Sequence, residues 1–138
     1  MSMGGDFYSI TEDQLTRLLE GDLAYGDFLY DSEGEQPREC FSQFERLWYE
    51  LSKVTQEENG CGVEICDVIP EICTYSYPDD VAETSEMLAG LDEATIQERC
   101  EEEGIETPYQ EVWAAVQGLK DFYQRAANNG DAVLFRVT

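Results

Sequence analysis

The C-terminal segment constrains the fold of this chain most, because a long helix pattern is followed at once by a strand pattern. Thr107 and Pro108 form a typical helix start, and Asn128-Asn129-Gly130 is a typical helix stop. Between them the apolar residues recur in steps of three and four: Val112, Trp113, Val116, Leu119, Phe122, Tyr123 and Ala126. Residues 132–137 then predict an apolar strand. Acids and bases balance over residues 109–138, at three each, which is typical of a structural core element.

The N-terminal third predicts a strand followed by two helices. Residues 6–10 alternate polar and apolar side chains, as a half-buried strand does. Thr11 and Gln14 make a capping-box pattern for a helix that starts at Glu12 and ends at Gly21. A second short helix is expected around residues 24–29.

The centre of the chain predicts one helix and then short strands. Residues 37–54 follow a polar loop and begin at a proline, which suits the first turn of a helix. Their apolar positions have helical spacing: Cys40, Phe41, Phe44, Leu47, Trp48, Leu51 and Val54. Residues 63–75 change period and predict one or two short strands separated near Pro70.

Two more helices are expected over residues 78–90 and 92–104, the second capped by Asp92. A chain of 138 residues with no internal repeat and no linker-like segment has the size of one domain. We therefore expect residues 1–138 to form a single α+β domain. Several amphipathic helices should pack on a small mixed sheet formed by N-terminal, central and C-terminal strands.

The net charge of −23, from 31 acids and 8 bases, limits the kinds of partner. The bases are scattered, so no basic patch is predicted, which argues against direct binding of nucleic acid or of an anionic membrane surface. No apolar run is long enough to span a membrane. Acids outnumber bases by nine to one over residues 1–36 and by fourteen to one over residues 61–108. A basic protein is the partner class that this charge favours.

Five cysteines at irregular spacing predict reduced thiols in the cytoplasm rather than a disulfide framework. Cys40 and Cys100 fall on apolar helical stripes and are expected in the core. Cys61 and Cys66 are five residues apart, and Cys73 lies seven further on, which departs from the usual paired spacing of a thiolate metal site. Buried thiols are the favoured interpretation of these central cysteines, and a metal site is the alternative.

The sequence contains no histidine, which removes the commonest general base and metal ligand. Serine and cysteine hydrolase mechanisms that depend on histidine are thereby excluded. Acidic surroundings raise the pKa of a thiol, so a cysteine nucleophile is disfavoured. Carboxylate pairs occur by chance among so many acids and identify no active site. We expect a chain that is not an enzyme and that has no catalytic residue, no cofactor and no metal.

The candidate partner-binding residues are acids of the 61–108 stretch. They are Glu98, Glu101, Glu102, Glu103 and Glu106, together with Asp79 and Asp80. Clustered like charges raise the association rate with a partner of opposite charge, although a solvated helix end is the alternative interpretation of such a run.

Several stretches resemble the YfbM-like family, a bacterial domain of unknown function. These are Met1-Ser2-Met3-Gly4, Ile10-Thr11, Gln14-Leu15, Tyr77-Pro78-Asp79-Asp80-Val81, and residues 122–134, which read FYQRAANNGDAVL. The resemblance covers nearly the whole chain and implies a small α+β fold with no established activity. Family members often carry a Trp-His-Gly-Leu-His-like helix, whereas residues 44–51 here read FERLWYEL, so no role of those histidines carries over.

Three classes of function remain after these exclusions. A noncatalytic binding domain is favoured, for example an immunity or antitoxin-like inhibitor of a basic toxin or effector. A DNA mimic that occupies the groove of a nucleic-acid-binding protein is the second class. A small enzyme that uses carboxylates, tyrosine or cysteine is the third. The sequence predicts no oligomeric state.

Overall fold

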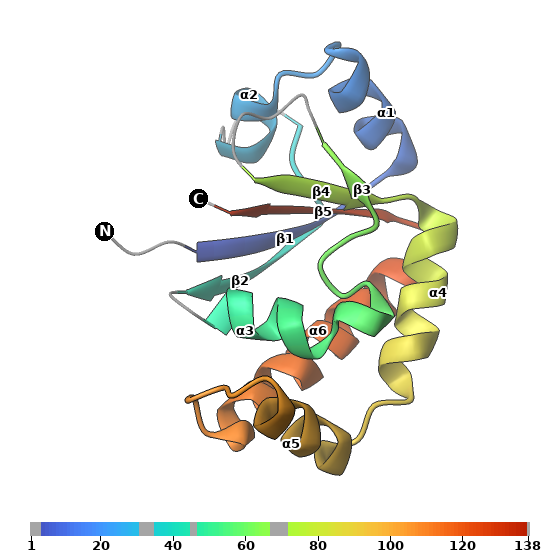
Figure 1. The fold of residues 1–138 in the computed structure, drawn as a ribbon. Coiled ribbons are helices and arrows are strands. Elements are labelled where there is room, and N and C mark those ends of the chain that lie inside the picture. Colours follow the sequence, from blue (N-terminus) through green and yellow to red (C-terminus); the bar gives the residue numbers. More distant parts are fainter. Residues whose placement is uncertain (1–3, 31–34, 45–46, 67–71, 138) are drawn as a thin grey trace.

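A sheet of five described strands lies at the centre of the fold, between two groups of helices (Figure 1). In the computed structural model, which describes residues 4–30, 35–44, 47–66 and 72–137, the strand order is β2-β1-β5-β4-β3. The strands are β1 (Gly4–Ile10), β2 (Glu39–Phe44), β3 (Glu64–Ile65), β4 (Cys73–Ser76) and β5 (Ala132–Val137). All four pairings among the described strands are antiparallel, so the expected mixed sheet is corrected to an antiparallel one.

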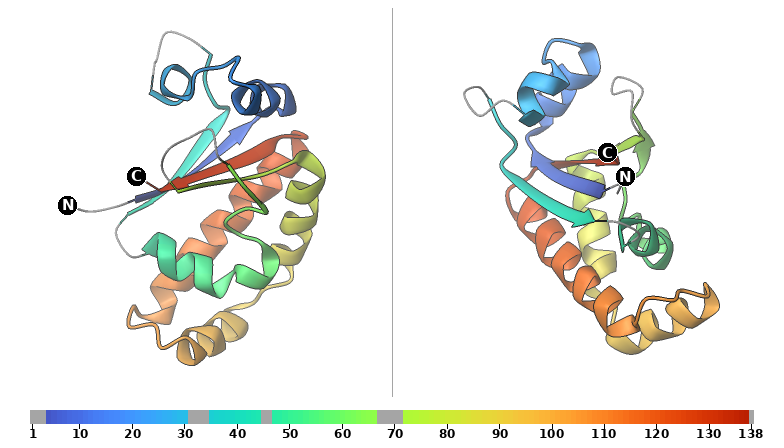
Figure 2. Two further views of the ribbon diagram at one scale, coloured as in Figure 1. Left: turned by 45° about the horizontal axis from the view of Figure 1, so that its top comes forward. Right: turned by 90° about the vertical axis from the view of Figure 1, so that its left-hand side faces the viewer.

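Helices cover both faces of this sheet (Figures 1 and 2). One face carries α1 (Glu12–Glu20) and α2 (Tyr25–Tyr30). The other face carries α3 (Leu47–Val54), α4 (Pro78–Ala89) and α6 (Tyr109–Asn128), and α5 (Glu93–Glu102) lies beyond them, farthest from the sheet. A short 3₁₀ turn, η1 (Gln56–Glu58), follows α3. The expected α+β fold is confirmed.

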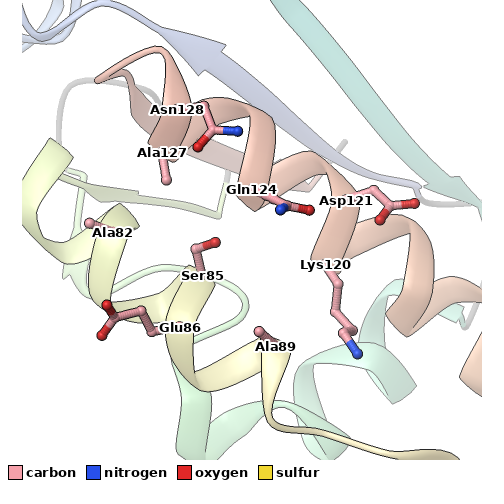
Figure 3. Close-up of a pocket in the computed structure, with 9 residues that line it drawn as sticks. All are labelled: Ala82, Ser85, Glu86, Ala89, Lys120, Asp121, Gln124, Ala127 and Asn128. Carbon is pink, nitrogen blue, oxygen red and sulfur yellow. The ribbon is translucent and has the colours of Figure 1, made fainter.

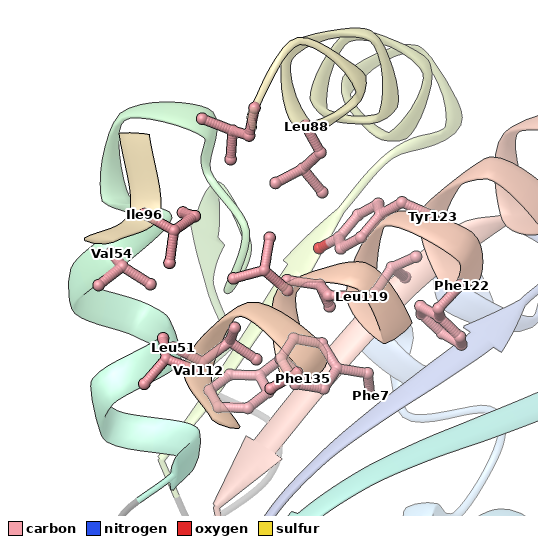
Figure 4. Close-up of a cluster of buried hydrophobic side chains, with 14 of the residues drawn as sticks. Phe7, Leu51, Val54, Leu88, Ile96, Val112, Leu119, Phe122, Tyr123 and Phe135 are labelled. Carbon is pink, nitrogen blue, oxygen red and sulfur yellow. The ribbon is translucent and has the colours of Figure 1, made fainter. Parts of the chain in front are cut away.

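Each sheet face has its own core, because neighbouring side chains of a strand point to opposite faces. Phe7, Val133 and Phe135 enter the larger core with α3, α4, α5 and α6, as Figure 4 shows for Phe7 and Phe135. Tyr8 and Leu134 enter the smaller core under α1 and α2. Every residue of β5 is therefore buried, which explains why its sequence is a continuous apolar run broken only by Arg136.

The helix termini follow the predicted capping chemistry. The Thr11 hydroxyl accepts from Gln14 N–H at 3.0 Å, and the Gln14 side chain accepts from Thr11 N–H at 2.9 Å, which confirms the capping box. Gly21 ends α1 at φ 82°, in the left-handed region that glycine favours. The Asp92 carboxylate accepts from Thr95 N–H at 2.8 Å and starts α5.

The prediction of one helix over residues 37–54 was wrong in its first half. Residues 39–44 form β2, which pairs with β1 and places Phe41 opposite Phe7, and a helix begins only at Leu47. Pairing with β1 outweighed the local helical spacing. The backbone N–H and C=O groups of β1 need hydrogen-bond partners on both sides, and β5 supplies them on one side only, so β2 supplies them on the other. Cys40 is consequently exposed on an edge strand instead of lying in the core.

The other predicted elements are confirmed, including the two central strands, the helices after Pro78 and Asp92, and the last helix and strand. Pro70, the predicted break between the central strands, lies outside the described residues. None of the described helices is both long enough and apolar enough to cross a membrane.

Candidate functional site

Helix α5 places most of the predicted acidic residues on the outside of the molecule. Its buried side is made by Ile96 and Cys100, which join the larger core. Left-handed Gly104 then reverses the chain, and Ile105 N–H donates to Cys100 O at 2.9 Å. All five predicted acids of this region are exposed, namely Glu98, Glu101, Glu102, Glu103 and Glu106, and we refer to these five as the α5 acidic surface.

The base within this helix, Arg99, hydrogen-bonds to groups that lie outside the acidic surface. Arg99 donates to Val54 O and to Glu58 Oε1, each at 2.7 Å, and reaches Glu57 at 3.2 Å. The hydrogen bond that Arg99 donates to Glu58 is the main reason that the pKa of Arg99 is raised. Its guanidinium thus ties α5 to the chain after α3.

A hollow between α3 and α5 adjoins the acidic surface. Its two parts, of about 110 and 260 Å³, share Lys53 and Glu103. Half-exposed Tyr49 lies in the second part, with the Lys53 ammonium 5.3 Å from its ring centre. Buried Glu50 accepts from the Thr107 hydroxyl at 2.6 Å. The hollow therefore carries both signs of charge, because Lys53 lies over its aromatic ring and Glu103 lines both of its parts.

The remaining predicted residues, Asp79 and Asp80, lie elsewhere. They belong to the first turn of α4, where carboxylates are favoured by the helix dipole. The 12 residues of α4 separate them from α5, a length of about 18 Å at 1.5 Å per residue. The structure thus brings the five α5 acids together and leaves Asp79 and Asp80 at the opposite end of α4.

A shallow groove of about 370 Å³ lies between α4 and α6 (Figure 3). Small side chains such as Ala82, Ala89 and Ala127 form much of its lining. Lys120 lines it as well, but its ammonium donates to Leu91 O at 3.0 Å and lies 5.2 Å from the Trp113 ring centre. Sequence reasoning missed this groove, although the small residues on both helices were its available signal.

Arg136 is a buried charge that the sequence analysis did not consider. It is 1% exposed and faces the smaller core, opposite Asp6 on β1 and Cys73 on β4. Burial is the main cause of the raised pKa of nearby Tyr8, Asp6 raises it further, and Arg136 acts in the opposite direction. These groups sit at the sheet centre, where they contribute to the structure of the strands.

The cysteines differ in environment but form no disulfide. Cys100 is buried, as predicted, and so are Cys66 and Cys73. Burial raises the pKa of the Cys61 thiol to about 12, which keeps it protonated and unreactive. Within the described ranges, no three side chains of the metal-binding types are grouped so that they could hold an ion.

Comparison with known proteins finds a solved structure of similar fold and a matching family model. A solved structure described as a protein of unknown function, YfbM, from Escherichia coli matches 98% of this chain and 99% of its own, with a TM-score of 0.71. At 15% identity, this likeness shows a shared fold and nothing about function. No curated protein matches the sequence. The model of a domain of unknown function, DUF1877, matches residues 1–136, and the chain therefore belongs to that family.

Proposed function

We propose that this chain is a noncatalytic binding domain that recognises a basic protein through the α5 acidic surface. An immunity or antitoxin-like inhibitor of a basic toxin or effector is the kind of protein that fits this description. The overall charge of −23 would attract such a partner at long range, and the exposed acids of α5 would meet it on contact.

The observation that carries this proposal is the position of these acids within their helix. Glu98, Glu101 and Glu102 crowd the C-terminal end of α5, where the helix dipole is negative and carboxylates are unfavourable. Arg99, the base of this helix, donates its hydrogen bonds to Val54 O and to Glu58 rather than to these acids, and it attracts only Glu102 of the three at longer range. A local arrangement that works against the stability of its own helix is expected where function, rather than folding, selects the residues.

A protein inhibitor is preferred to a DNA mimic because of the spacing of the acids. A mimic needs carboxylates that follow phosphates over a long surface. Asp79 and Asp80, the other candidate acids, lie a helix length away from α5. An enzyme is less favoured, because the groove between α4 and α6 is shallow and is lined largely by small side chains.

The test compares two variants with the same net charge. One carries Glu98→Gln, Glu101→Gln and Glu102→Gln, and the control carries Glu12→Gln, Glu20→Gln and Glu83→Gln, which are also exposed. Each immobilised protein is offered lysate of the native organism at low salt, and the retained proteins are purified for titration calorimetry. We expect the wild type and the control to bind a basic protein, and the α5 variant to bind it about tenfold more weakly or worse.

Two results would contradict the proposal. Equal binding by the α5 variant and the control would show that total charge, rather than this surface, attracts the partner. Retention that does not respond to added salt would show that the contact is not electrostatic. A DNA mimic would be revealed instead if the protein displaced DNA from several unrelated DNA-binding proteins.

A further inference from the structure

Several exposed apolar side chains lie near one edge of the sheet, around the edge strand β3 and its neighbour β4. Five large apolar residues of the described chain are exposed, and four of them belong to the segments around β3 and β4: Val63, Ile65, Ile72 and Tyr77. Ile65 is 76% exposed and Ile72 is 62% exposed, which is unusual for isoleucine in a strand region. We refer to Val63, Ile65 and Ile72 as the β3 patch.

The β3 patch lies on one face of the sheet, and the acidic residue of the same strand, Glu64, points to the other face. Ile65 is opposite Thr74, and Thr74 is opposite Phe135, so Ile65 is on the face that α3 and α6 cover. Glu64 is opposite Tyr75 and points to the other face, toward the α1 and α2 side. Going along β3, the exposed side chains therefore alternate between apolar and acidic.

The backbone at this edge is also positioned for pairing. β3 is the last strand in the sheet order, and among the described residues no strand lies beyond it. Cys66 N–H donates to Cys73 O, so the backbone groups of the preceding residue, Ile65, point away from β4. The opposite edge differs, because β2 carries exposed Cys40 and Ser42, and its Glu39 is paired with Arg125.

We propose that the β3 edge binds an extended segment of the basic partner, which adds to the sheet as a sixth strand. Side chains of an added strand alternate in the same way as those of β3. Apolar residues of the segment would then contact Ile65 and Val63, and each intervening lysine or arginine would lie beside Glu64. The recognised sequence is therefore one that alternates apolar and basic residues. The inference rests on the proposed function for the basic character of the partner.

A second copy of the chain is a poorer occupant of the same edge. Two β3 strands side by side would bring together two molecules that each carry a charge of −23, with Glu64 of each copy at the shared edge. A basic segment removes this repulsion and replaces it with attraction. Charge complementarity therefore selects a partner of different composition over self-association.

The test uses synthetic peptides as probes. One peptide alternates valine and lysine, a second has the same composition with the lysines grouped at one end, and a third is the alternating peptide with N-methyl groups on alternate residues. Binding is measured by fluorescence anisotropy, and the contact is located from amide chemical shifts. We expect only the first peptide to bind well and to shift the amides of β3 and β4. Blocking the peptide N–H groups should remove binding, because strand addition requires them.

Variants of the protein complete the test. Ile65→Lys should weaken binding of the alternating peptide about tenfold, because it replaces an apolar contact with a repelling charge. Gln117→Lys, an exposed change of equal charge on α6, should leave binding unchanged. Equal binding of the grouped peptide, or chemical shifts confined to α5, would overturn the inference. Concentration-dependent dimers that Ile65→Lys abolishes would overturn it as well, by showing that a second copy occupies the edge.

The outcome is separable from that of the proposed function. The Glu98, Glu101 and Glu102 variant should bind the alternating peptide as the wild type does, because β3 is unchanged in it. If the alternating peptide does not bind, the result for partner binding by the α5 variant still stands. If the α5 variant binds the partner as the control does, the result for peptide binding at β3 still stands.

Discussion

Gly118, in the middle of α6, offers a sharp test of how β2 packs. A Cβ atom at this position would lie 2.9 Å from Cε1 and 3.0 Å from Cζ of Phe41 on β2, closer than carbon atoms approach without movement. The Phe41 ring has little room to move, because ring centres of Phe7 and Phe122 lie 5.8 and 6.0 Å away. A side chain at position 118 would therefore meet a neighbouring ring that has to move to admit it.

Two opposing effects set the sign of Gly118→Ala. Alanine is the better helix former by about 1 kcal/mol. Overpacking against a confined side chain costs about 1–3 kcal/mol. We expect Gly118→Ala to lower the free energy of unfolding by about 1 kcal/mol in the wild type. In a Phe41→Leu background, which removes the ring atoms, the same change should raise it by about 1 kcal/mol.

Urea unfolding of the four proteins in this cycle measures the coupling directly. The expected interaction energy between positions 41 and 118 is about 2 kcal/mol, large for a pair that is distant in sequence. If Gly118→Ala had the same effect in both backgrounds, Phe41 would not lie against α6. The description of residues 39–44 as a strand that faces this helix would then be refuted.

Two further predictions concern Arg99 and the thiols. Arg99→Ala should lower the free energy of unfolding by about 1–3 kcal/mol, because Glu58 is buried and would lose its cation, whereas Arg125→Ala, at an exposed ion pair, should change it little in the same urea experiment. With a thiol reagent, Cys40 alone of the five cysteines should react readily in the native protein. Burial raises the pKa of Cys40, so its rate should still climb with pH above the usual thiol range, and Cys40→Ser should abolish this reaction while denaturant exposes the other thiols.

Local chemistry made most helices predictable. Thr11 with Gln14, Pro78 and Asp92 mark helix starts through hydrogen bonds or a fixed dihedral angle that involve only neighbouring residues. Such signals do not depend on the rest of the fold. The last helix was predictable for a similar reason, since its long stripe of apolar residues could be buried in no other conformation.

The error at residues 37–54 has a different origin. Phe41 and Leu51 both face the larger core, so the sequence shows one apolar pattern, but they reach it from a strand and from a helix. The pattern records which residues are buried, and the backbone conformation that buries them depends on β1 being available as a neighbour. No residue within 37–44 carries that information.

The candidate site was predictable in part, by the same distinction. The exposed position of Glu98, Glu101 and Glu102 follows from the helical pattern of α5, in which Ile96 and Cys100 form the buried side. The distance of Asp79 and Asp80 from them depends on the direction of α4. The exposure of Ile65 and Ile72 depends on β3 being the last strand of the sheet, which is a property of topology.

The arrangement of the elements decides whether one partner can use both surfaces. In Figure 1 and in the right-hand view of Figure 2, β3, α3 and α5 lie on the same side of the molecule, with α3 between the other two. Helix α3 carries exposed Tyr49, which lines a hollow together with Glu103 of the α5 acidic surface. One partner that contacts both surfaces would therefore pass over α3 (Figures 1 and 2). A basic body on α5 with an extended arm on β3 would thus use the charge for attraction and the strand edge for selectivity, which charge alone does not provide.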